Sequence, residues 1–240
     1  MSIGAPSLEK GWLKKKKKSK KQIMIIVNFK NYKETFGDGA LKLAEICKKV
    51  AQKSGVEIIP AVSALDAGLI QKELKMKVFL QSVDPVFEGR GSGFVSPLKA
   101  VDLKIEGSLL NHSEHRLRPG TIKKMLSIWP KDFKSVVCLS SLGQIEGWAR
   151  NIKPDYIAYE PRNLIASKEK SVATENPQTI KRIVEFYKKI PVLVGAGIHS
   201  VEDVKVSLKM GASGILISSF IVQSKEAEKN LSKLAEVFIS

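Results

Sequence analysis

The stretch from residue 191 to residue 219 reads PVLVGAGIHSVEDVKVSLKMGASGILISS and contains one complete unit of the fold. Residues 191–194 form a short apolar run that is typical of a β-strand buried on both faces. Residues 201–210 place apolar side chains at helical spacing, and residues 214–217 are again strand-like. Because strand, helix and strand follow one another closely, we expect the two strands to pair in parallel through a right-handed crossover.

The same alternation continues outward to residue 23. The predicted strands are residues 23–29, 56–62, 78–83, 105–110, 135–139, 156–159, 191–194 and 214–217. The predicted helices are residues 41–51, 64–74, 97–104, 121–128, 142–151, 177–188, 201–210 and 227–238. Proline is expected to open the helix at residue 97, and Asn176 to cap the helix at residue 177. Eight such units predict an α/β protein with one domain, a (β/α)₈ barrel, and a doubly wound open sheet is the alternative.

Composition excludes several classes of protein. The 240 residues are 43% apolar and 27% charged, which is typical of a globular domain rather than a disordered or collagen-like chain. No apolar run approaches the ~18 residues of a membrane-spanning helix, so we expect no membrane insertion. The only two cysteines, Cys47 and Cys138, lie far apart in sequence. We therefore expect no disulfide framework and a cytoplasmic location.

The charge is concentrated near the N-terminus. The chain carries a net charge of +16, and residues 1–22 contribute eight Lys and one Glu to it. We expect residues 1–22 to be a disordered basic extension and residues 23–240 to be the barrel, with Met24 as an alternative start. A Lys run can attract nucleic acid or anionic lipid, but Trp12 is the only aromatic residue available there for base stacking. We therefore do not expect nucleic acid as a partner, and the segment lacks the apolar region of a signal peptide.

Polar or small residues follow five of the predicted strands. These segments are Asn28-Phe29-Lys30, Asn111-His112-Ser113-Glu114, Glu160-Pro161, Gly195-Ala196-Gly197 and Ser218-Ser219. In a parallel barrel all five lie at the carboxyl ends of the strands, where active sites are built. Each segment is a weak signal alone, but the combination predicts one site.

The residue types in these segments suggest distinct chemical roles. Lys30 would place a positive charge beside a phosphate or a developing enolate. Glu160 is a candidate general base, and His112 could polarise a carbonyl as a neutral donor. The small residues after the last two strands would let backbone N–H groups approach an oxyanion.

These motifs together resemble the triosephosphate isomerase family. Asn28-Phe29-Lys30 is similar to the family's first-strand motif, residues 111–114 to its fourth-strand motif, and Glu160-Pro161 to its sixth-strand motif. Residues 195–198 and 216–219 resemble its phosphate loops. Residues 81–85, with Ser92-Gly93 after them, resemble the third loop of archaeal members. The resemblance covers residues 23–238 and indicates the short, archaeal branch.

The resemblance implies an isomerase of glycolysis and gluconeogenesis that interconverts dihydroxyacetone phosphate and glyceraldehyde 3-phosphate. The catalytic residues that it implies are His112, Glu160, Lys30 and Asn28. The residues that it implies for substrate and phosphate binding are Asn28, Phe29, Lys30, Ile165, Ala166, Gly197, Ser218 and Ser219. It implies no metal and no organic cofactor. Glu114 would support the site, and Ser92 would reach a neighbouring subunit, which implies a homodimer or homotetramer.

The loop after the sixth strand departs from the family pattern. Members usually carry Ile-Gly-Thr-Gly there, whereas this chain reads IASKEK over residues 165–170. Because closure of this loop protects the reaction intermediate from water, loss of both glycines makes a barrel that binds sugar phosphate without turnover the alternative function. Phe220 stands where a small residue is usual, so it either faces the core or narrows the phosphate pocket. Residues 162–163 read Arg-Asn, where archaeal members often have Pro-Glu.

Overall fold

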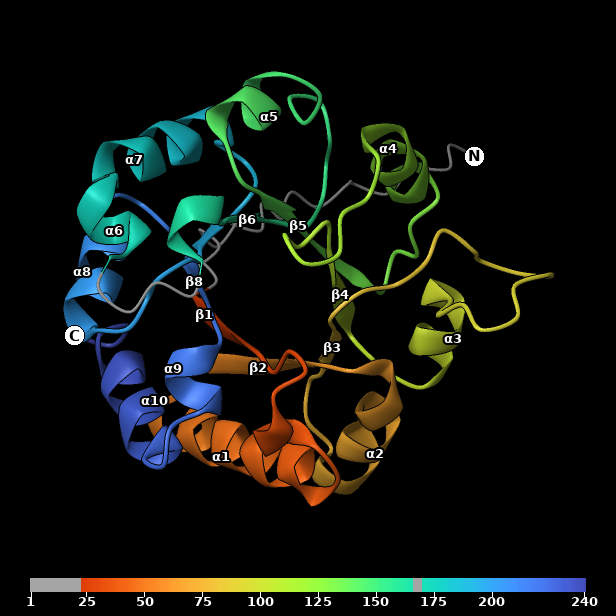
Figure 1. The fold of residues 1–240 in the computed structure, drawn as a ribbon, viewed down its shortest axis with the longest axis horizontal. Helices are drawn as coiled ribbons and strands as arrows, with labels where there is room; N and C mark the ends of the chain where they lie inside the picture. Colours follow the sequence, from red (N-terminus) through yellow and green to blue (C-terminus); the bar gives the residue numbers. More distant parts are fainter. Residues whose placement is uncertain (1–22, 166–169) are drawn as a thin grey trace, which may run out of the picture.

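The expected barrel is confirmed. The computed structural model describes residues 23–165 and 170–240. Eight parallel strands form a closed barrel in chain order, with the last strand paired to the first, and helices surround it (Figure 1). The structure therefore excludes the open-sheet alternative. The predictions for the basic extension at residues 1–22 and for Ala166 and the loop up to residue 169 lie outside the described residues.

All eight predicted strands are present. They are β1 (Met24–Asn28), β2 (Glu57–Val62), β3 (Phe79–Leu80), β4 (Gly107–Leu110), β5 (Lys134–Leu139), β6 (Tyr156–Tyr159), β7 (Val192–Val194) and β8 (Gly214–Ile217). The strand predicted over residues 78–83 is much shorter, because β3 pairs with each neighbour through only two residues. The chain then leaves the sheet in a long loop that projects from the barrel (Figure 1).

The helices cover the outside of the barrel. They are α1 (Asp38–Ser54), α2 (Ala64–Leu74), α3 (Pro97–Asp102), α4 (Pro119–Ser127), α5 (Leu142–Glu146), α6 (Val172–Glu175), α7 (Pro177–Phe186), α8 (Val201–Lys209), α9 (Ser219–Val222) and α10 (Ala227–Glu236). Two 3₁₀ turns, η1 (Lys33–Thr35) and η2 (Arg162–Leu164), follow β1 and β6. None of the described helices is both long enough and apolar enough to cross a membrane.

Several predicted helix boundaries are wrong. The helix predicted over residues 142–151 ends at Glu146, because the backbone of Gly147 leaves the helical region and turns follow it. The helix predicted from residue 121 already begins at Pro119, which occupies the first turn. Asn176 occupies the N-cap position of α7, as predicted, but its side chain makes no capping hydrogen bond.

The core has two layers separated by the sheet. One layer fills the barrel and consists of Met24, Ile26, Ile59, Ala61, Phe79, Leu109, Val136, Cys138, Tyr156, Ala158, Leu193 and Leu216. The other layer lies between the strands and the surrounding helices. Because both faces of each strand are buried, the strands read as continuous apolar runs rather than as an alternating pattern. Polar side chains are left to the strand ends, where the site lies.

Candidate active site

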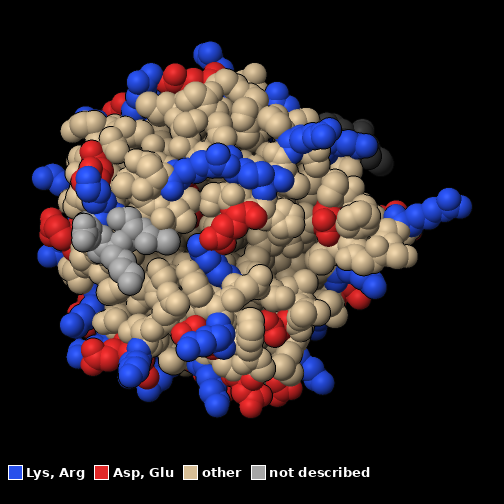
Figure 2. All heavy atoms as spheres, viewed as in Figure 1, with Lys and Arg blue, Asp and Glu red and all other residues tan. Residues whose placement is uncertain are grey.

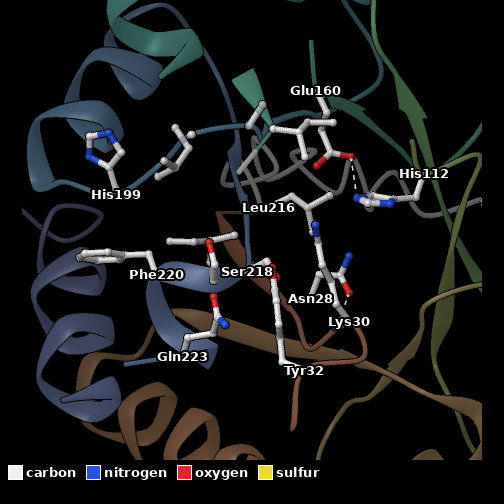
Figure 3. A pocket seen from close by; sticks show the side chains of 16 residues that line it. Asn28, Lys30, Tyr32, His112, Glu160, His199, Leu216, Ser218, Phe220 and Gln223 are labelled. Carbon is white, nitrogen blue, oxygen red and sulfur yellow. Dashed lines mark hydrogen bonds and ion pairs between the residues drawn. The ribbon is translucent and has the colours of Figure 1, made fainter. Parts of the chain in front are cut away.

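The predicted strand-end residues surround one pocket at the carboxyl end of the barrel. The pocket has a volume of about 610 Å³ and takes residues from the ends of β1, β4, β6, β7 and β8. Asn28, Lys30, His112, Glu160, Gly197, Ser218 and Ser219 all line it, as the sequence predicts, and so does Ile165. Glu160 and His112 lie together at one side, and Phe220 and Gln223 lie at the other (Figure 3).

The side chains of Glu160 and His112 lie close together in the pocket. Oε2 of Glu160 lies 3.7 Å from Nε2 of His112, and both side chains are more than nine-tenths buried. Oε2 has no hydrogen-bond partner among the described residues. A buried carboxylate oxygen without a hydrogen-bond partner is energetically costly. Because no group of the described residues occupies this oxygen, a substrate atom can approach it. The Glu160 main chain is fixed, since its N–H donates to the carbonyl of Leu139 at 2.8 Å.

The backbone fixes the tautomer that we assign to His112. Nδ1 of His112 accepts a hydrogen bond from the N–H of Glu114 at 3.3 Å. Because a neutral imidazole has one donor and one acceptor nitrogen, its proton then lies on Nε2. This is the nitrogen nearest to Glu160. His112 is therefore arranged to donate a hydrogen bond into the pocket.

Lys30 is held in an unusual backbone conformation. Its φ is +50°, in the left-handed region that side chains other than Gly seldom adopt. Its N–H donates to Oδ1 of Asn28 at 3.1 Å, and its carbonyl accepts from Nε2 of Gln81 at 3.0 Å. Nζ of Lys30 contacts Oε1 of Glu114 at 2.6 Å. Two side chains thus hold the strained backbone, and a third orients the ammonium group.

Backbone N–H groups without a hydrogen-bond partner among the described residues also line the pocket. The amides of Gly197, Ile198, Ser219 and Phe220 donate no hydrogen bond to another described residue, although all four residues line the pocket. Backbone N–H groups of this kind bind phosphate in many proteins. Phe220 lines the pocket and is also packed, partly buried, against the core, so both positions expected for it are realised.

Comparison with known proteins identifies the family. Residues 23–236 match the family model described as Triosephosphate isomerase. The chain belongs to the triosephosphate isomerase family. It is 35% identical over 216 residues to the triosephosphate isomerase of Methanothermus fervidus, covering 88% of this chain and 96% of the relative. It is 36% identical to that of Saccharolobus solfataricus, covering 86% and 92%, and 35% identical to that of Archaeoglobus fulgidus, covering 90% and 98%.

Three residues expected from the triosephosphate isomerase resemblance do not line the pocket. The side chain of Phe29 is 1% exposed and packs in the core, so it does not line the pocket. Ser92 is exposed on the loop that follows β3. Glu114 does not line the pocket, but it contacts Lys30 and His112 from behind.

Sequence reasoning assigned no positioning role to two residues of the motifs that it named. One is Gln81, through its bond to Lys30. The other is Asn111, which has a φ of +60° and precedes His112. Its side chain donates to the carbonyl of Cys138 at 2.9 Å and accepts from the N–H of Leu117 at 3.1 Å. An Asn directly after a strand was an available signal, because Asn tolerates the left-handed region better than most residues.

Cys138 borders the same site from inside the barrel. Burial raises the pKa of its thiol well above the ordinary value, and the neighbouring Glu160 carboxylate raises it further. The thiol therefore stays protonated and neutral at physiological pH.

Burial also lowers the pKa of the Arg116 guanidinium, whose Nη2 donates to Oγ of Ser140 at 3.1 Å.

Proposed function

We propose that this protein isomerises dihydroxyacetone phosphate and D-glyceraldehyde 3-phosphate by proton transfer through an enediolate. The observation that carries the proposal is the approach of Glu160 to Nε2 of His112 in a pocket that also holds Lys30. Family membership fixes the reaction class as isomerisation of a triose phosphate.

The three side chains divide the chemistry among them. Glu160 removes a proton from the carbon next to the carbonyl, because its free oxygen is buried beside the histidine. His112 donates its Nε2–H to the carbonyl oxygen and stabilises the enediolate, which is the pairing known from this family. Lys30 supplies positive charge to the developing oxyanion, and Asn28 holds the Lys30 backbone. These groups complete the proton transfer, so we propose no metal and no organic cofactor.

The other side of the pocket binds the phosphate group. The free N–H groups of Gly197, Ile198, Ser219 and Phe220 are suited to phosphate oxygens. We include Ser218 and Ile165 as neighbouring contacts, and Ala166 as a residue expected from the family. Figure 2 shows both basic and acidic side chains beside the centre of this face. Lys30 lines the pocket, and we assign its ammonium group to substrate binding.

The direct test is isomerisation of glyceraldehyde 3-phosphate by the wild type and by Glu160→Gln. We expect the variant to lower kcat by about 10²- to 10⁴-fold, because it loses the base but keeps the shape of the side chain. Glu185→Gln, an exposed position on α7, is the matched control and should change nothing. A wild type that binds inorganic phosphate without isomerising the substrate would contradict the proposal and support the non-catalytic binder.

We propose that the protein acts as a homo-oligomer with a dimer as its smallest form. Leu65, Leu69 and Phe94 are 93%, 52% and 56% exposed, and a subunit interface that covers them would remove this apolar surface from water. Phe94 lies on the projecting loop that also carries Ser92. Sedimentation equilibrium should give a dimer or tetramer, and Phe94→Asp should shift it toward the monomer. A wild type that is monomeric at micromolar concentration would contradict this.

We propose that residues 23–240 are the catalytic domain and that residues 1–22 do not take part in the reaction. The enzyme would act in the cytoplasm, without nucleic acid or membrane as a partner. Deletion of residues 1–22 should leave kcat and KM unchanged, because every proposed site residue lies beyond them. A loss of activity on deletion would contradict this division of the chain.

A further inference from the structure

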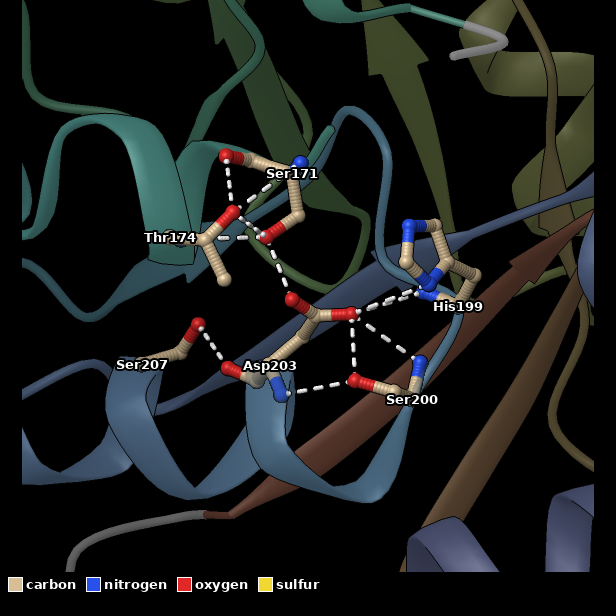
Figure 4. A network of polar contacts seen from close by, with 6 residues as sticks. All are labelled: Ser171, Thr174, His199, Ser200, Asp203 and Ser207. Carbon is tan, nitrogen blue, oxygen red and sulfur yellow. Dashed lines mark hydrogen bonds and ion pairs between the residues drawn. The ribbon is translucent and has the colours of Figure 1, made fainter. Parts of the chain in front are cut away.

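Asp203 is a buried acid at the start of α8 that the reaction itself does not use. It is 1% exposed. Its Oδ1 accepts a hydrogen bond from Oγ of Ser171. Its Oδ2 accepts from the N–H groups of His199 and Ser200, at 3.1 and 3.0 Å, and from Oγ of Ser200 at 2.7 Å (Figure 4). All four donors thus converge on one carboxylate, which satisfies its buried charge.

Helix capping explains only part of this arrangement. Ser200 is the N-cap of α8, and its Oγ accepts from the N–H of Asp203 at 3.1 Å in a capping box. A capping box does not require the bonds from Ser171 and from the His199 backbone. Those two bonds join α8 to the segment that begins α6 and to the loop that follows β7. Asp203 therefore links three elements.

The loop after β7 needs such support. Ala196 and Gly197 have φ values of +69° and +72°, in the left-handed region that is unfavourable for a residue such as Ala. Gly197 is pressed against the neighbouring segment, since a Cβ on it would clash with the carbonyl of Lys170 and lie 2.9 Å from Cα of Ser171. The N–H of Val172 also donates to the carbonyl of Ala196 at 3.3 Å. The conformation of the loop thus depends on contact with residues 170–172.

The bonds of Asp203 divide the amides of this loop into two groups. Those of His199 and Ser200 donate to the Asp203 carboxylate. Those of Gly197 and Ile198 donate to no described residue and line the pocket. Nδ1 of His199 also lies 3.5 Å from Oδ2 of Asp203. The amides of Gly197 and Ile198 are therefore available to an anionic ligand, while the amides of His199 and Ser200 hold the loop through Asp203.

We propose that Asp203 is a positioning residue for phosphate binding, which rests on the function proposed above. It fixes the loop of residues 196–200 against Ser171, so that the amides of Gly197 and Ile198 meet the substrate phosphate. It makes no contact with the substrate itself, because all its bonds are made to the protein. Its effect is exerted on the amides that bind phosphate, because none of its bonds is made to Glu160 or His112.

The test compares substrates with and without the phosphate group. Asp203→Asn keeps the size of the side chain but places an NH₂ group against one of the donors. We expect kcat/KM for glyceraldehyde 3-phosphate to fall about tenfold or more, and the inhibition constant of inorganic phosphate to rise by a similar factor. The rate constant kcat/KM for glyceraldehyde, which lacks the phosphate, should be unchanged. Asp102→Asn, an exposed position on α3, is the matched control.

A general structural role would give a different result. Equal losses with both substrates, or an unchanged inhibition constant for phosphate, would overturn the proposal. If Asp203→Asn does not fold, Ser171→Ala carries the test, since it removes only one of the four donors and should weaken phosphate binding several-fold. Calorimetry with inorganic phosphate needs no turnover. It therefore still reports on Asp203 if the wild type proves not to be an isomerase.

Discussion

Single atoms around Glu160 decide where its carboxylate lies. Gly195 directly follows β7, and because it has no side chain, the Glu160 carboxylate fits beside it. A Cβ on Gly195 would lie 2.6 Å from Cγ and 2.8 Å from Oε1 of Glu160. Neither distance is tolerated by real side chains, so any larger residue displaces the base.

We therefore predict that Gly195→Ala lowers kcat/KM by about 100-fold, because a displacement of roughly 1 Å at a reacting group has that effect. Steady-state isomerase kinetics would measure it, with a thermal melt to show that the fold is kept. Gly143→Ala is the control, since the nearest atom to its added Cβ is Oγ of Ser141 at 3.8 Å. Full activity in Gly195→Ala would show that Glu160 can work from another position.

The strained backbone of Lys30 gives a second prediction at this scale. Gln81→Leu removes the hydrogen bond to the Lys30 carbonyl while keeping the size of the side chain. Loss of one such bond is worth about 1 kcal/mol, so kcat/KM should fall about 5- to 10-fold. The same assay measures it, and Gln178→Leu on the exposed face of α7 should have no effect. An unaltered rate would mean that Asn28 alone is sufficient to hold Lys30.

At the scale of elements, hydrogen bonds between Ser135 and Asp155 join the amino ends of β5 and β6, away from the pocket. Oδ2 of Asp155 accepts from both the N–H and Oγ of Ser135 at 3.0 Å, and Oγ of Ser135 accepts in return from the N–H of Asp155 at 3.0 Å. Ser135 is 1% exposed. The pair therefore fixes the start of β6 beside β5, opposite the catalytic end of the strands.

Asp155→Ala should lower the free energy of unfolding by about 1–3 kcal/mol, because it leaves the buried Ser135 groups without their acceptor. Residues at the amino end of barrel strands serve stability rather than catalysis, so kcat should not change. Urea unfolding and the isomerase assay test the two halves of this prediction. Asp132→Ala, an exposed neighbour, should leave stability unchanged. A large loss of activity in folded Asp155→Ala would contradict the separation of the two ends.

At the scale of the whole molecule, the buried weak acids set the alkaline limit of stability. Burial raises the pKa of the Cys47 thiol and of the Tyr156 and Tyr187 hydroxyls to about 12. Each raised pKa means that the folded state keeps a proton that the unfolded chain loses near its ordinary pKa, about 9 for Cys and 10 for Tyr. Their contribution to stability is complete below those values and is lost as the pH rises toward 12.

We therefore predict that the free energy of unfolding falls from about pH 9 upward, and more steeply above pH 10, where the tyrosines join. Urea unfolding at a series of pH values between 8 and 11 would measure it. Tyr187→Phe should reduce the slope above pH 10, because one titrating group is removed. An identical slope in the variant would show that Tyr187 does not contribute.

The sequence by itself determined the order of strands and helices and most of the pocket, and it favoured a barrel, whereas the pairing of β8 with β1 that closes the barrel was decided by the tertiary structure. Each strand is a continuous apolar run in the sequence because it is buried on both faces. Parallel pairing then brings the carboxyl ends of all the strands together, however far apart they lie in the chain. The short elements η1, η2, α6 and α9 were not predicted, because three or four residues are too few to show a helical periodicity in the sequence.

Only the tertiary structure decided which residues hold the proposed catalytic and phosphate-binding groups in place. Gln81 bonds to a residue 51 positions away, Asn111 to one 27 positions away, and Asp203 to one 32 positions away. Local propensity carries no information about such partners, because each bond depends on how separate loops pack after the barrel has closed. Gly195 is a similar case, since its missing side chain matters only beside Glu160. Chemistry at the strand ends is therefore visible in the sequence, whereas the support behind it appears only in the folded chain.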